Sequence, residues 1–170
     1  MGSPVQRPVE VFRVNPITFW VTIVGAVLLQ TYLPLKVDLA KHFDFLLLAT
    51  IYFSLLRRNK VFGIGMGTVL GLLQDALSHR FIGIHGMPKA LVGYLAASAS
   101  IKFALDPLLA RLTLAGIFVL VHDLFLAGIE HALLEVPQPL YALNLVISLL
   151  VNVALGLILF QLLDRFKQPS

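Results

Sequence analysis

The chain has 170 residues, of which 58% are hydrophobic and only 13% are charged, and its formal net charge at pH 7 is +4. Because soluble domains usually carry about 25% charged residues, this composition argues against a soluble domain and predicts a polypeptide solvated by lipid. The absence of cysteine excludes disulfides, thiolate metal sites and cysteine nucleophiles.

Six long apolar runs predict an all-α, polytopic membrane protein with a single membrane domain over residues 1–170. A helix needs about 20 apolar residues to cross hydrocarbon, and unbroken runs favour helices over the alternating strands of a membrane barrel. Residues 1–15 are polar and the first run is long enough to stay as an anchor, so we expect no cleaved signal peptide. The predicted spans are residues 17–35, 43–56, 61–77, 87–105, 108–129 and 140–163.

The distribution of Lys and Arg predicts that both termini lie in the cytoplasm. These residues lie between the apolar runs, so we interpret them as topology signals and expect no nucleic-acid partner. Nine of them fall on the side of the termini and four on the other side. The first group is Arg7, Arg13, Arg57, Arg58, Lys60, Lys102, Arg111, Arg165 and Lys167, and the second is Lys36, Lys41, Arg80 and Lys89.

Two aspartates inside the predicted spans indicate a candidate site. Asp75 lies roughly 21 Å into the third span and Asp123 roughly 22 Å into the fifth, at 1.5 Å of rise per residue. Both spans run outward, so the two carboxylates are expected at similar depth in the outer half of the membrane. Ionisable groups at such depth are costly and need partners. We predict an outer-side polar pocket or helix-pairing cluster formed by Gln74, Asp75, His85, Lys89, His122 and Asp123.

Three interpretations of this cluster stay open. In the first, Asp75 pairs with Lys89 and holds neighbouring helices together. In the second, the pocket binds a small ligand or a partner. In the third, Asp75 and Asp123 share a proton and activate water, as the paired carboxylates of aspartyl proteases do. The sequence patterns of intramembrane aspartyl proteases and of lipoprotein signal peptidase are missing, which weakens this third interpretation.

The histidines and glycines predict neither a metal site nor a nucleotide site. None of the five histidines (His42, His79, His85, His122 and His131) forms an i, i+4 pair, so we expect no metal. The run from Gly63 to Gly67 superficially resembles a phosphate loop, but no strand precedes it and no Lys-Ser/Thr follows it. Small residues instead predict close helix packing, either within the chain or with a partner, at Gly63, Gly67, Gly71, Gly93 and Ala97.

An ordered set of motifs between Phe43 and Ala97 carries a family resemblance. An apolar run led by Asp44 contains Ile51-Tyr52-Phe53, and a basic turn, Arg57-Arg58, follows it. The next helix is studded with glycine and ends in Gly71-Leu72-Leu73-Gln74-Asp75. The set closes with Ser78, Gly83, His85-Gly86 and Val92-Gly93-Tyr94. On these residues the chain resembles the rod shape-determining protein MreD family, although Lys89 is not a required position of the family pattern.

This resemblance implies a multi-pass protein of the bacterial inner membrane that belongs to the cell-elongation machinery, which directs peptidoglycan synthesis and rod shape. Members of the family are not known as enzymes, so neither catalysis nor a cofactor is expected. The implied partners are MreC most directly, then the actin-like MreB, the glycosyltransferase RodA and a penicillin-binding transpeptidase, and a homo-oligomer stays open. The leading hypothesis is a non-enzymatic scaffold that binds the transmembrane helix of MreC.

The same family resembles the substrate-binding S components of energy-coupling-factor transporters, which are six-helix bundles with an outward-facing pocket. The alternative function is therefore a component that binds a small, vitamin-type transport substrate. Such components usually carry several small residues in their first helix. Only Gly25-Ala26 is small between Phe19 and Ala26, and this disfavours the alternative.

Overall fold

Six α-helices follow one another along the chain in the computed structural model, which describes residues 12–78, 81–103, 107–134 and 141–169. Each helix overlaps one of the six ranges predicted from the apolar runs. The helices are α1 (Pro16–Tyr32), α2 (Phe45–Arg57), α3 (Lys60–Leu77), α4 (Gly86–Lys102), α5 (Leu108–Leu134) and α6 (Tyr141–Asp164). Two short 3-10 helices, η1 (Leu33–Leu35) and η2 (Asp38–His42), connect α1 to α2.

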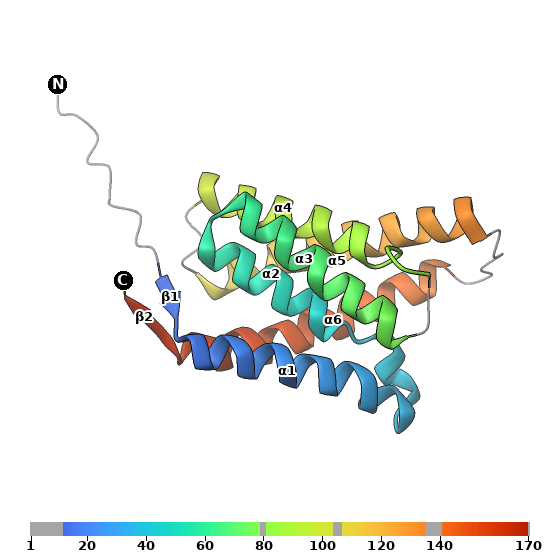
Figure 1. Ribbon diagram of the computed structural model, residues 1–170, viewed down its shortest axis with the longest axis horizontal. Coiled ribbons are helices and arrows are strands. Elements are labelled where there is room, and N and C mark those ends of the chain that lie inside the picture. Colours follow the sequence, from blue (N-terminus) through green and yellow to red (C-terminus); the bar gives the residue numbers. More distant parts are fainter. Residues whose placement is uncertain (1–11, 79–80, 104–106, 135–140, 170) are drawn as a thin grey trace.

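The prediction of a helical chain is confirmed, with one addition. Two short strands, β1 (Phe12–Val14) and β2 (Lys167–Pro169), pair in antiparallel fashion, with Val14 opposite Lys167. This ribbon joins the segment before α1 to the segment after α6, so both ends of the described chain lie at one end of the bundle (Figure 1). We call this the ribbon end and the opposite one the far end.

Polar side chains determine where several helices begin. The Asn15 side chain accepts a hydrogen bond from the Ile17 N–H, and Pro16 occupies the first turn of α1. Asn59 caps α3 in the same way through the Phe62 N–H (3.0 Å). Between α2 and α3, Arg58 has a left-handed backbone (φ 50°), which stops α2 and lets the chain reverse immediately.

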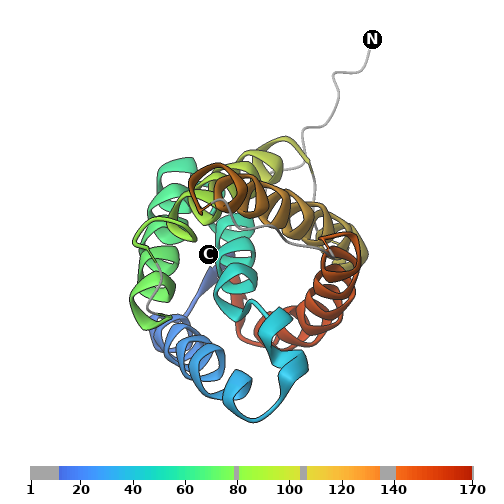
Figure 2. The ribbon, with the colours of Figure 1, turned by 90° about the vertical axis from the view of Figure 1, so that its right-hand side faces the viewer.

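The central helix of the bundle is α2. Its ten consecutive residues from 46 to 55 are all buried, and an end-on view shows α2 surrounded by the other helices (Figure 2). A helix that is apolar on every side is expected in such a position. At thirteen residues, α2 is also the shortest of the six described α-helices and has a length of about 20 Å.

Glycines bring α3 and α4 into close contact. A Cβ atom at Gly63 would overlap the carbonyl oxygen of Gly93, and one at Gly67 would overlap that of Lys89. A Cβ atom at Gly71 would lie 2.5 Å from the Gly86 Cα. Ala97 lies next to Gly63 on the same side of α4. The small residues picked out in the sequence therefore face one another inside the bundle.

Three of the described helices are long and apolar enough to cross a membrane, judged by length and composition: Pro16–Leu35, Leu108–Leu133 and Ala142–Asp164. The central α2 is apolar but shorter. The outer surfaces of the three long helices carry many exposed large apolar side chains, among them Trp20, Val24, Leu120, Leu150 and Ile158. Such extensive apolar surface is consistent with a protein that lies in lipid.

Candidate functional site

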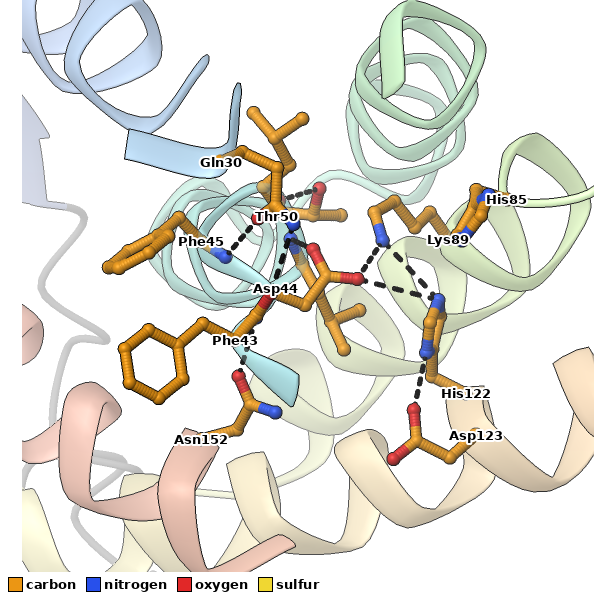
Figure 3. A network of polar contacts seen from close by, with 12 residues as sticks. Gln30, Phe43, Asp44, Phe45, Thr50, His85, Lys89, His122, Asp123 and Asn152 are labelled. Atoms are coloured by element: carbon orange, nitrogen blue, oxygen red, sulfur yellow. Dashed lines mark hydrogen bonds and ion pairs between the residues drawn. The ribbon is translucent and has the colours of Figure 1, made fainter. Parts of the chain in front are cut away.

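A network of polar side chains lies at the far end of the bundle, where α2 begins. Its members come from segments that are distant in sequence: the start of α2, α4, α5 and α6 (Figure 3). Five of the six predicted site residues are buried, and the sixth, Asp123, is partly buried. Asp75 near the end of α3 and Asp123 in α5 lie at the same end of the bundle.

The centre of the network is an ion pair between Lys89 of α4 and Asp44. The Lys89 side chain is completely buried and that of Asp44 is 14% exposed. Asp44 Oδ2 accepts a hydrogen bond from Lys89 Nζ, while Asp44 Oδ1 accepts one from the Leu47 N–H (2.8 Å) and thereby caps α2. One carboxylate thus starts the central helix and neutralises a buried ammonium group.

The contacts of Lys89 and Asp123 define the tautomer of His122. The ammonium group of Lys89 lies 3.3 Å from His122 Nε2 and can only donate, so Nε2 must accept. The ring proton then belongs on Nδ1, which lies 2.9 Å from Asp123 Oδ1 and donates to it. Asp123 Oδ2 accepts a further hydrogen bond from the Ser148 hydroxyl at 2.6 Å. This geometry describes a neutral imidazole between an ammonium group and a carboxylate.

Asn152 of α6 closes the network into a ring. Its Oδ1 accepts a hydrogen bond from the backbone N–H of Asp44 (2.9 Å), and its Nδ2 donates to the carbonyl oxygen of His42 (2.8 Å) and to the Ser148 hydroxyl (3.2 Å). On the other side of the same turn, Gln30 of α1 donates to the carbonyl oxygen of Phe43 and accepts from the N–H of Phe45. Two amide side chains therefore satisfy the backbone where the chain enters α2.

Asp75 has its own set of partners in the connection from α3 to α4. Its carboxylate accepts hydrogen bonds from the backbone N–H of Gly83 (2.8 Å) and of His85 (3.0 Å), and it lies 2.7 Å from His85 Nδ1. Gly83 adopts a φ of 104°, a conformation that side chains rarely tolerate, so this turn requires a glycine. Asp75 thus fixes the loop that leads into α4.

The expected pair between Asp75 and Lys89 is wrong. Lys89 pairs with Asp44, because the acceptor capacity of Asp75 is directed to the backbone and ring of the loop before α4. The hydrogen bonds of Asp75 and Asp123 also go to different partners. The geometry therefore does not show the two aspartates sharing a proton.

A polar cavity of about 350 Å³ adjoins the network. Four of the predicted site residues line it, namely Gln74, His85, His122 and Asp123, whereas Asp75 and Lys89 do not. At its rim Lys41 donates to Asp38 (2.7 Å), and this hydrogen bond lowers the pKa of the exposed Asp38 carboxyl group. Residues not predicted from the sequence also line the cavity: Gln30, Lys41, His42, Phe43, Asp44, Leu126, Ala127, Glu130, Asn144, Leu145 and Ser148.

Some of the missed residues left a signal in the sequence. Asn144, Ser148 and Asn152 are spaced four residues apart in an otherwise apolar helix, so they form one polar stripe along α6. Gln30 is likewise a polar residue inside the first apolar run. Within the described part of the chain, no group of three His, Cys, Asp or Glu residues is placed to hold a metal ion.

A second polar cluster lies at the ribbon end. Arg111 of α5 contacts both carboxylate oxygens of Asp164 at the end of α6, with Nη1 to Oδ1 at 2.9 Å. The Tyr52 hydroxyl of α2 donates to the same carboxylate at 3.0 Å. A bidentate contact of this kind gives a fixed geometry, so the cluster ties three helices together.

The comparison with protein families gives one match. The family model described as rod shape-determining protein MreD matches residues 10–166, a range that includes all six helices and both polar clusters. No match is found among the curated proteins, and none among the solved structures. The family resemblance seen in the sequence is confirmed.

Proposed function

The chain belongs to the rod shape-determining protein MreD family, and on this premise we propose that it is a non-enzymatic scaffold of the bacterial inner membrane. In this role it binds the transmembrane helix of MreC and holds it within the machinery that builds peptidoglycan during elongation. MreB, RodA and a penicillin-binding transpeptidase are then indirect partners. The family match carries this proposal.

The geometry supports a topology of six crossings with both termini in the cytoplasm. Pairing between β1 and β2 keeps the two ends of the chain on one side, which requires an even number of crossings between them. At 1.5 Å per residue, α3 and α4 are about 27 and 26 Å long, close to the hydrocarbon thickness of about 30 Å. The excess of Lys and Arg on the side of the termini favours the cytoplasm for that side.

The internal contacts support a structural role for the polar network. Asp44, Asp75 and Asp123 each accept hydrogen bonds from groups within the chain, as buried carboxylates must in a stable fold. Their partners belong to the starts of helices, to a loop and to neighbouring helices. The transporter alternative gains no support from the family match.

We place the MreC helix against α1. The glycine contacts of α3 are used inside the bundle against α4, so this stripe is not available to a partner. Among the three long apolar helices, α1 is the least buried, with only 6% of its apolar window covered. Its outer face is apolar and includes Trp20, Val21, Val24 and Leu28. Packing between apolar helices in lipid relies on such complementary surfaces.

The test is co-purification of co-expressed MreC in mild detergent. Loss of MreC from the unaltered chain would overturn the scaffold proposal. A set of three glycines provides matched variants, because a Cβ at Gly25 of α1, Gly65 of α3 or Gly128 of α5 meets nothing within 4 Å in the described structure. Leucine at each position adds bulk where the bundle leaves room for a Cβ, so we expect it to block close approach of a partner with little effect on the bundle. We expect Gly25→Leu to lose MreC and the other two to retain it, and the reverse pattern would refute docking on α1.

A further inference from the structure

The polar cavity at the far end has the size and accessibility of a binding site for a small molecule. Its volume of about 350 Å³ lies at the lower end of the range for ligand pockets, about 300–1,000 Å³. The Lys41 side chain, which lines the cavity, is 63% exposed, so the cavity reaches the surface there. Leu126, Ala127 and Leu145 give it an apolar wall.

One residue of the cavity lining has a buried hydrogen-bond acceptor without a partner. Gln74 of α3 is 6% exposed, and its side-chain Oε1 is buried with no hydrogen bond in the described structure. His42, which also lines the cavity, has a buried Nδ1 atom without a hydrogen-bond partner. Buried polar groups of native proteins are normally paired, so these atoms indicate that something else supplies the missing contacts.

The charge balance around the cavity indicates which kind of group this is. Three carboxylates line the cavity, those of Asp44, Asp123 and Glu130. The ammonium group of Lys89 compensates Asp44, and Glu130 has an interaction of its own. The Asp123 carboxylate is bonded to Ser148 and to His122, whose contacts define a neutral ring. The other nearby ammonium group, that of Lys41, is bonded to Asp38. The network therefore leaves one negative charge beside an unpaired acceptor.

We propose that this cavity binds the primary ammonium group of a small amine, with Asp123 supplying the charge and Gln74 Oε1 accepting an N–H hydrogen bond. An ammonium group has three donors and no acceptor, which complements a carboxylate and an unpaired carbonyl oxygen. An anion would meet the uncompensated carboxylate and two ammonium groups that are already paired. The amine could be a free solute or the head group of phosphatidylethanolamine. This proposal does not rest on MreC binding.

Ethanolamine and choline form a matched pair of probes for the purified full chain. Both carry one positive charge, but the quaternary nitrogen of choline has no N–H donor. Isothermal titration in detergent is expected to show saturable binding of ethanolamine and at least about tenfold weaker binding of choline, the effect of losing charge-assisted hydrogen bonds. Equal binding of the two probes would overturn the proposal. So would the absence of saturable ethanolamine binding together with equal stabilisation of the chain in the two kinds of nanodisc described below.

Variants of the cavity wall separate this site from non-specific charge effects. Gln74→Leu removes the unpaired oxygen at nearly constant volume, and Asp123→Asn removes the charge at constant shape. Each is expected to weaken ethanolamine binding about tenfold or more. The control is Gln161→Leu on the exposed face of α6, which is expected to leave binding unchanged. Unchanged binding by Gln74→Leu would refute the proposed contact even if Asp123→Asn fails to fold.

Nanodiscs distinguish the two sources of the amine. If the lipid head group is the ligand, the chain is more thermally stable in phosphatidylethanolamine than in phosphatidylcholine. This difference is then lost in Gln74→Leu and kept in Gln161→Leu. Binding of free ethanolamine in detergent assigns a soluble amine. Retention of MreC by Gln74→Leu is the expected result if the two functions are separate, so either proposal can fail alone.

Discussion

Replacement of Lys89 by methionine tests whether the buried ion pair holds the far end of the bundle together. Methionine preserves most of the side-chain volume but leaves the Asp44 carboxylate without its cation. Removal of one partner from a buried pair typically costs about 3–5 kcal/mol of unfolding free energy. Asp44 keeps its hydrogen bond from the Leu47 N–H and its proximity to His122, so we expect about 3 kcal/mol, at the lower end of that range.

The double variant with Asp44→Asn determines whether the cost comes from the pair itself. Asparagine caps a helix about as well as aspartate, so this change keeps the start of α2 and removes only the charge. With both charges gone, the loss is expected to fall to about 1 kcal/mol, because a buried pair replaced by neutral groups is often nearly neutral in stability. The coupling between the two positions is then about 2 kcal/mol or more, which a double-mutant cycle measures directly.

The cycle needs the free energies of unfolding of the unaltered chain, the two single variants and the double variant. Reversible unfolding by dodecyl sulfate in mixed micelles provides them, with far-UV circular dichroism as the signal. The control is Lys102→Met, since Lys102 lies in the last turn of α4 with an exposed side chain, and we expect a change within about 0.5 kcal/mol there. The reasoning is refuted if Lys89→Met unfolds at the same denaturant fraction as the unaltered chain. It is refuted equally if the losses of the two single variants simply add in the double variant.

Three further predictions use the same unfolding assay. Gly67→Ala is expected to lower the free energy of unfolding by about 1–3 kcal/mol, because the added Cβ overlaps the backbone of α4. Gly65→Ala has open space around its Cβ and is expected to be neutral or slightly stabilising. Equal stability of the two variants would contradict the observed packing. Arg111→Lys keeps the charge but loses the bidentate contact and is expected to cost about 1.5–3 kcal/mol, against no measurable change for the exposed Arg165→Lys. Asp75→Asn weakens the charge-assisted hydrogen bonds to the loop before α4 and is expected to lower the free energy of unfolding by about 1–3 kcal/mol. Unaltered stability combined with loss of a biochemical activity would instead support the enzymatic interpretation.

The sequence predicts the positions of the helices well because each of them depends on local information. Apolar runs and their breaks locate all six helices, and the i, i+4, i+8 spacing of Gly63, Gly67 and Gly71 identifies the stripe that packs closely. The cost of placing an ionisable group in a helix of a membrane protein is also local, so Asp75 and Asp123 are found from the sequence without any knowledge of their partners.

The pairing of these groups could not be predicted, because it depends on which helices lie side by side. Lys89 pairs with Asp44, a residue 45 positions earlier that looks from the sequence like an ordinary start of an apolar helix. Asn152 lies 108 positions from the backbone N–H of Asp44 that it satisfies. The pairing of β1 with β2 likewise joins the two ends of the chain. Such contacts are set by tertiary arrangement alone.

The shortness of α2 explains why a polar ring exists at this place. In the proposed topology of six crossings, a helix about 20 Å long does not extend over the full hydrocarbon thickness of about 30 Å, so its entry turn lies below the membrane surface and needs hydrogen bonds from side chains. Gln30 and Asn152 supply the hydrogen bonds that this turn needs, and Asp44 complements the positive end of the helix dipole. Lys89 then balances the charge that Asp44 introduces. Each member of the ring is thereby explained by the fold, whereas the unpaired Gln74 Oε1 and His42 Nδ1 at the cavity are not.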